Sequence, residues 1–272
     1  MVATDATALP GSARDRAAIR AVAVLLCGAA LNGFWAQIVS TWYLHGLSSP
    51  LLGTSPFDIV AAGVGTWAIL RSDDRPLAYF PVPELALAGF LLVPSSAVTW
   101  FGIAAFALFR ALHASSEQRI GFLFFLGLAG CAVWSTTVIK LVAGPAAFLD
   151  VHGVAAILSW LRDDIEIHGN VVGAPAGHNV VVLTVCSTAY VLPRALLGFA
   201  ALVHLAGGAP RQRMLIAGLA AGLLVIAVNL TRLSVMAWST EHYWFMHGPI
   251  GANIVDATQT LAVVLVAIWA AK

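Results

Sequence analysis

Charged residues are scarce in this sequence. They make up 10% of its 272 residues, whereas a soluble domain carries about 25%. Hydrophobic residues make up 60%, and the mean hydropathy is +0.89. Apolar runs of about 18 or more residues are typical of helices that cross a membrane. The scarcity of charge therefore argues against an ordinary soluble domain and indicates an integral membrane protein.

Cysteine is also rare, and the three cysteines (Cys27, Cys131 and Cys186) are far apart in the chain. This number and spacing exclude a disulfide framework and a zinc site. Cys27 and Cys131 lie inside apolar runs, and we interpret them as packing residues. The sequence also lacks a glycine-rich phosphate loop, an internal repeat and a basic stripe, so we expect no nucleic-acid partner. The first apolar run is too long for a cleavable signal peptide, and we expect a retained first helix.

The apolar runs predict an all-α integral membrane protein with about eight transmembrane helices. A further apolar segment, 144–161, contains Asp150 and His152 and is loosely amphipathic, so we expect an interfacial helix there. Alternating residues at 165–172 predict a small extracytoplasmic β-hairpin, and β-branched residues at 179–185 favour another strand. The predicted spans are 19–42, 57–70, 84–95, 97–112, 120–142, 184–206, 212–236 and 249–271.

This pattern predicts three parts in the chain. Residues 1–16 form a disordered cytoplasmic tail, residues 17–142 hold the N-terminal transmembrane helices, and residues 143–271 hold the last three spans and the candidate site. If segment 144–161 does not cross the membrane, ten basic residues lie on the same side of the membrane as the two termini, and two lie on the opposite side. Positive charge marks the cytoplasm, which predicts cytoplasmic termini in an inner (plasma) membrane. The ten are Arg14, Arg16, Arg20, Arg71, Arg75, Arg110, Arg119, Arg211, Arg213 and Lys272, and the two are Lys140 and Arg162.

Three chemically active side chains lie near ends of apolar segments that this topology places on the outer side. Cys186 begins one span, and a helix N-terminus favours the nucleophilic thiolate; the alternative is a structural thiol. Arg232 is costly inside a span unless it faces a polar partner; the alternative is that it reaches the interface. Asn229 shares its helical face. Arg194 is a further basic residue inside a span, eight residues after Cys186.

His247 is the third of these side chains. It precedes Gly248 and Pro249 at the start of the last span, so its position is fixed by the helix. An imidazole takes up or releases a proton near neutral pH. The alternative is a solvated loop residue, beside aromatic residues 243–245 of an interface belt.

The order of these features resembles the exosortase/archaeosortase family. The resemblance covers residues 140–271: an amphipathic segment, a hairpin with Gly169-Asn170, the cysteine at a helix start, Asn-x-x-Arg at the next helix end, and the histidine before the last helix. The family's Cys, Arg and His fall on Cys186, Arg232 and His247. The family has Gly and Arg where this chain has Thr188 and Tyr190, which places the chain in a divergent branch.

The resemblance implies a membrane-embedded cysteine protease or transpeptidase. Its partner would be the C-terminal sorting signal of exported proteins, in which a short motif precedes a membrane helix and a basic tail. Membrane lipids would surround the protein itself. Catalytic roles fall on Cys186, Arg232 and His247, supporting roles on Asn229 and Arg194, and no metal or other cofactor is implied. Two alternatives remain open: a non-catalytic membrane scaffold or assembly factor for surface export, and a small anion transporter with Arg194 and Arg232 along its pathway.

Overall fold

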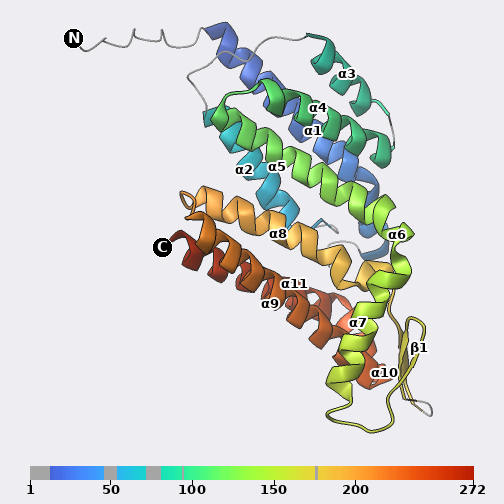
Figure 1. Ribbon diagram of the computed structural model, residues 1–272. Helices are drawn as coiled ribbons and strands as arrows, with labels where there is room; N and C mark the ends of the chain where they lie inside the picture. The colour runs from blue at the N-terminus through green and yellow to red at the C-terminus, as the bar shows by residue number, and fades with distance from the viewer. Residues whose placement is uncertain (1–12, 46–53, 72–80, 94, 175–176) are drawn as a thin grey trace. The chain divides into compact units, whose positions relative to one another are not determined.

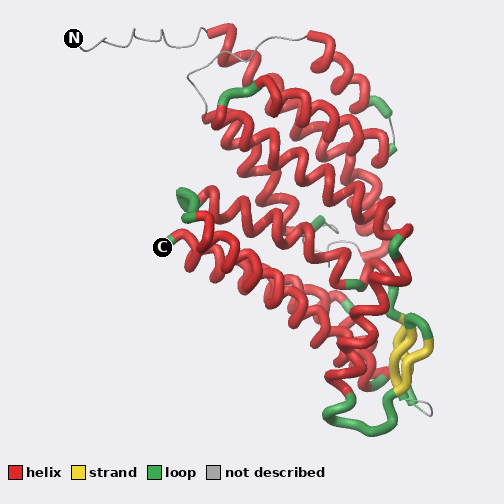
Figure 2. The backbone as a smooth tube through the Cα atoms, viewed as in Figure 1, coloured by secondary structure: helices red, strands yellow, loops and turns green. Residues whose placement is uncertain are grey.

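The computed structural model describes residues 13–45, 54–71, 81–93, 95–174 and 177–272, and most of these residues are helical (Figures 1 and 2). Contacts divide the chain into two units, Met1–Ala36 with Ala61–Gly130, and Gln37–Val60 with Cys131–Lys272. Helix α1 (Ala13–His45) begins inside the tail predicted at 1–16, of which residues 1–12 lie outside the described residues. The division of the chain into three functional parts stays a prediction.

The expected all-α membrane fold with a small sheet is confirmed. Six segments of the described residues are long and apolar enough to cross a membrane, so the chain is a multi-pass membrane protein. Two of the eight predicted spans are shorter, because α2 (Pro56–Arg71) has 16 residues and α3 (Pro81–Leu91) has 11, whereas a span needs about 20. The six segments are Arg16–Val39, Ser96–His113, Ser116–Leu141, Thr184–Leu205, Arg211–Trp238 and Pro249–Ala271.

The first unit contains most of α1 and α2, all of α3 and α4 (Ser96–His113), and α5 (Ser116–Val133) up to Gly130. Its helices approach closely at glycines, as membrane helices do in the absence of a hydrophobic driving force between them. A Cβ added at Gly121 would lie 2.6 Å from the carbonyl oxygen of Gly65. Arg110 is buried within α4 and forms an ion pair with Glu84. This ion pair therefore connects α4 to α3 within the first unit.

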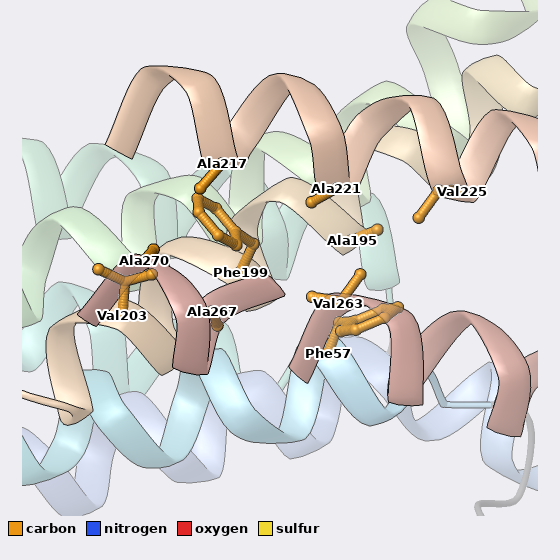
Figure 3. Packing of buried hydrophobic residues seen from close by; sticks show 10 residues of the cluster. All are labelled: Phe57, Ala195, Phe199, Val203, Ala217, Ala221, Val225, Val263, Ala267 and Ala270. Carbon is orange, nitrogen blue, oxygen red and sulfur yellow. The ribbon is translucent and has the colours of Figure 1, made fainter. Parts of the chain in front are cut away.

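The second unit is built around three long helices, α8 (Thr188–Leu205), α9 (Arg211–Trp238) and α11 (Pro249–Ala271), each packed against the other two. Their shared core is made largely of alanine and valine with Phe57 and Phe199 as the large members (Figure 3). Small side chains let the helix backbones come close and gain dispersion contacts. The ten core residues are Phe57, Ala195, Phe199, Val203, Ala217, Ala221, Val225, Val263, Ala267 and Ala270.

The predicted hairpin is present and extended by a third strand. Strands β1 (Glu166–His168), β2 (Val171–Gly173) and β3 (Asn179–Val181) form an antiparallel sheet in that order. Gly169 has φ +64 in the β1–β2 turn, a conformation that glycine adopts without steric cost. The sheet packs through Val172 and Val180 on helix α7 (Ala143–Leu158) and on the C-terminal part of α9. Figure 2 shows the strands in yellow beside these helices.

Two local features differ from the sequence expectation. The polar loop expected before the last span is a short helix, α10 (Thr240–His247), whose N-cap Ser239 accepts a hydrogen bond from the His242 N–H at 3.2 Å. The span predicted at 120–142 consists of α5, a π-helical turn over Trp134–Val138 and the short α6 (Ile139–Leu141). Such π turns are frequent at functional sites.

Candidate active site

Cys186 lies in a tight 3₁₀ turn, Thr184–Cys186, immediately before α8. The Cys186 N–H donates to the Leu183 carbonyl at 2.9 Å, and the Ser187 hydroxyl donates to the Thr184 carbonyl at 2.7 Å. These bonds fix the turn, and the thiol itself is free and half-buried. Cys186 therefore directly precedes Ser187, the N-cap at the positive end of α8, and is not inside the helix.

Asn229 holds the Cys186 turn against α9. Its side chain is completely buried, and its Nδ2 donates to the Cys186 carbonyl and to Thr188 Oγ1, both at 3.1 Å. One amide group therefore joins the backbone of the candidate nucleophile to the helix that carries Arg232. This is a positioning contact between residues 43 apart in the chain.

Asp150 of α7 anchors the turn from the other side. Its Oδ2 accepts the Thr188 N–H at 2.8 Å, which satisfies one of the free N–H groups at the start of α8. Burial raises the pKa of Asp150, and the hydrogen bonds from Thr188 oppose that rise. In the sequence, Asp150 only interrupts an apolar segment, but an acid in such a segment is itself a signal of a polar partner.

Arg232 is the electrostatic centre of the cluster. Its charge acts on Cys186 in the turn before α8, on His247 at the end of α10, and on Asp256 of α11. Its Nε is buried and has no hydrogen-bond partner among the described residues. A buried guanidinium N–H without a partner is unfavourable in isolation, and here it remains available to an oxygen that arrives with a substrate. Asp256 was not singled out from the sequence.

His247 is the last residue of α10, and its ring is exposed. The ring stacks on Tyr243, with ring centroids 5.1 Å apart and planes inclined by 15°. The pKa of His247 is lowered from 6.5, mainly because its ring is partly removed from water and, to a smaller extent, because of the positive charge of Arg232. The imidazole is therefore mostly neutral at pH 7 and able to accept a proton.

The three predicted catalytic residues come from different elements that end at one side of the second unit. The start of α8, the end of α9 and α10 lie together there, next to α7 and the sheet (Figure 1). No hydrogen bond joins Cys186, Arg232 and His247 within the described part of the chain. The positive charge of Arg232 acts on each of the other two groups, and catalytic contacts are often loose before a substrate binds.

Arg194 lies in a different environment, deeper along α8. Its Nη2 donates to Ser135 Oγ at 3.0 Å, in the π-helical turn, and its Nε lies 3.7 Å from Asp58 Oδ2. The guanidinium also lies over the Tyr190 ring, 4.8 Å from its centroid. The structure therefore separates Arg194 from the contacts made by Cys186 and Arg232. Among the described residues, no three His, Cys, Asp or Glu side chains are grouped as metal ligands.

The Asn229 contacts give the first testable prediction. Asn229→Leu removes the donor from the Cys186 carbonyl and from Thr188 Oγ1, and we expect it to lower the free energy of unfolding by about 1–3 kcal/mol. Thermal unfolding of the purified protein in detergent measures this. Ser234→Ala is the matched control, because Ser234 is also buried on α9 but, among the described residues, its hydroxyl donates to the Leu230 carbonyl of its own helix. Equal effects of the two substitutions would contradict the positioning role.

No family model, no curated protein and no solved structure matches this chain.

Proposed function

We propose that this protein is a membrane-embedded cysteine protease or transpeptidase that processes C-terminal sorting signals of exported proteins. The observation that carries the proposal is that a free thiol just before α8, a guanidinium near the end of α9 and an imidazole at the end of α10 come from elements that pack together in one unit. The resemblance of residues 140–271 to the exosortase/archaeosortase family supports the same chemistry.

The reaction follows from the properties of the three groups. The neutral His247 ring takes the thiol proton, and the Cys186 sulfur attacks the peptide carbonyl carbon to form a C–S bond. The carbonyl electrons move to its oxygen, and the Arg232 guanidinium stabilises that negative charge. The C–N bond then breaks, and His247 gives its proton to the leaving amine, which leaves a thioester on Cys186.

The second half of the reaction releases the product. Water or an amine attacks the thioester carbonyl while His247 accepts its proton. The C–S bond then breaks, and the released Cys186 thiolate takes that proton back from His247, which restores the thiol and the neutral ring. Water gives hydrolysis, and an amine gives transpeptidation. All proton transfers use the same imidazole, which must therefore be neutral at the beginning of each half-reaction.

Strand β3 offers a place for the substrate chain next to the thiol. Among the described strands, β3 pairs only with β2, and four residues separate its end from Cys186. The side chains of Val181, Leu183 and Val185 alternate along this stretch and are exposed. An extended substrate that pairs with the free edge of β3 would be guided toward Cys186 by main-chain hydrogen bonds.

The proposed chemistry requires the site to face outward from an inner (plasma) membrane, with both termini in the cytoplasm. A reporter inserted at Gly208, between α8 and α9, should then read cytoplasmic. A reporter inserted at Gly169, in the exposed hairpin turn, should read extracytoplasmic. Both glycines have positive φ and open space around them, so either insertion is expected to leave the helices intact. Two reporters on the same side would contradict this topology.

The pH dependence of the reaction is set by His247. Below its pKa the ring is protonated and cannot accept the thiol proton, and above that pKa it is neutral and competent. Because the pKa is lowered from 6.5, we expect kcat/KM to fall only as the pH drops below about 6.5. A pH profile with the purified protein and the C-terminal segment of a processed protein measures this. An acid limb centred above pH 7 would contradict the assignment.

The function itself is tested by comparing the C termini of exported proteins in two strains. One strain carries the intact chain, and the other carries Cys186→Ser at the same level. We expect a set of exported proteins to be shortened only in the first strain. Identical C termini in both strains would overturn the proposed function.

A further inference from the structure

The second unit contains a cavity of about 750 Å³ that none of the three catalytic residues lines. It lies between the beginning of α2, the first turns of α8 and the first half of α11. Apolar side chains, among them Phe57, Val191 and Leu261, make up much of its wall. Polar side chains of α8 and α11 (Tyr190, Arg194, Asn253, Asp256 and Gln259) complete it.

Two donor groups of residues that line the cavity make no hydrogen bond within the described part of the chain. Gln259 is 3% exposed, and its Nε2 makes no hydrogen bond with the described residues. Arg194 is 9% exposed, and its Nε is likewise without a hydrogen bond, since Asp58 Oδ2 at 3.7 Å is too distant. Buried donors are nearly always satisfied in folded proteins. Two such donors from different helices around one cavity indicate a ligand that carries acceptor oxygen.

The charge around the cavity indicates that this ligand is neutral. The Asp58 carboxylate lies beside the Arg194 guanidinium, and the Asp256 carboxylate interacts with Arg232. Each basic group of this region therefore already has an acid to balance it. An anionic headgroup would meet Asp256 at the wall and gain no uncompensated cation. A neutral amide or hydroxyl meets the two donors at no such cost, and the apolar wall suits the body of a hydrophobic helix.

The cavity lies next to the candidate site, farther along α8 and α11. Tyr190, which lines the cavity, is four residues after Cys186. Asp256 also lines the cavity and interacts electrostatically with Arg232. With a rise of 1.5 Å per residue, Arg194 is about 9 Å along α8 from Thr188 and Gln259 is about 15 Å along α11 from Pro249. A straight helix that passes the cavity covers the same depth with about 6–10 residues.

We propose that this cavity binds the membrane-spanning helix of the substrate and selects an Asn, Gln, Ser or Thr about 6–10 residues after the cleaved bond. The proposal rests on the proposed function, because it assigns a subsite to the same substrate. The polar side chain of the substrate helix accepts hydrogen bonds from Gln259 and Arg194. Leucine at that position leaves both donors without a partner, and binding weakens accordingly.

The test uses an exported protein that is shortened only when Cys186 is intact, and the full-length chain with Cys186→Ser, which leaves that substrate uncut. A photo-crosslinking amino acid replaces Ala257, which lines the cavity, or its neighbour Thr258, which does not. Both residues are exposed and at the same depth on α11, so they form a matched pair. We expect a crosslink to the substrate helix from position 257, none from 258, and loss of the 257 crosslink when the polar residue of the substrate is changed to Leu.

A second measurement keeps the test independent of crosslinking. In the otherwise intact chain, Gln259→Leu should raise KM for the natural substrate about tenfold, which is the effect of one lost hydrogen bond to a polar ligand. It should have no further effect on the Leu-substituted substrate, because the two changes remove the same interaction. Additive effects, equal crosslinks at both positions, a lipid adduct at position 257, or substrate helices without a polar residue at this depth would each overturn the subsite. Cys186-dependent shortening would still stand in those cases, whereas its absence would overturn the proposed function and the subsite together.

Discussion

Cys186→Ser should abolish the shortening of exported proteins while the chain accumulates in the membrane at its normal level. Serine has nearly the shape of cysteine, but its hydroxyl is hardly ionised at neutral pH and is a much poorer nucleophile. The turn around Cys186 is held by backbone bonds and by Asn229, none of which involves the sulfur. The measurement is the fraction of substrate cleaved in intact cells, together with the amount of folded protein in the membrane.

The other two cysteines supply the control for this substitution. Cys27 contacts Thr66 Oγ1 at 3.1 Å in the first unit, and Cys131 is buried near the end of α5. Cys27→Ser and Cys131→Ser should leave cleavage unchanged at equal amounts of protein. A non-catalytic scaffold or a transporter would tolerate Cys186→Ser as well as these two changes. Full cleavage by well-expressed Cys186→Ser would therefore contradict the nucleophile assignment.

Arg232→Gln should lower the rate of cleavage by about 10²–10³-fold, the effect of removing one donor to a developing oxyanion. Arg232→Lys keeps the positive charge but loses the planar set of donors that includes the buried Nε. A loss with Lys close to that with Gln means that Arg232 acts through directed hydrogen bonds, and a much smaller loss means that it acts through its charge. Cleavage rates with purified protein and substrate measure both variants.

Arg213→Lys and Arg213→Gln are the matched controls, since Arg213 is on the same helix but at its opposite end and exposed. They should change the rate little. Asp256 loses a neighbouring charge in Arg232→Gln, so the unfolding temperature of each variant is recorded beside its rate. A fully active and stable Arg232→Gln protein would contradict the role of the guanidinium.

The sequence predicted the long helices well, because their boundaries are changes from apolar to polar residues. The hairpin followed from the alternation at 165–168 and from Gly169-Asn170. The helix α10 was missed because its aromatic and polar residues have no clear helical period, although Ser239 followed by Glu241 is a usable start signal. The π-helical turn at Trp134–Val138 leaves the residue types of a span unchanged, so no pattern in the sequence marks it.

The sequence indicated which residues are candidates for the site. It did not indicate their hydrogen-bond and ion-pair partners. The sequence places Asn229 and Arg232 on one helical face, but the bond from Asn229 to the Cys186 carbonyl joins two helices through a backbone atom. Arg194 was noticed as a charge inside a span, yet Asp58 and Ser135 lie 136 and 59 residues from it. Long-range pairs of this kind depend on the packing of helices, which local patterns do not specify.

A nucleophilic Cys186 forms a thioester with the substrate, and the mass of the peptide that contains Cys186 measures this directly. Purified protein in detergent is mixed with an equimolar amount of an exported protein that it shortens, and the reaction is quenched with acid during the first turnover. The protein is then digested, and the masses of its peptides are measured by mass spectrometry. The account predicts that this peptide gains the mass of the substrate residues preceding the cleaved bond, and that neutral hydroxylamine removes the added mass. Complete cleavage in that first turnover with a Cys186 peptide that never gains this mass would contradict the account.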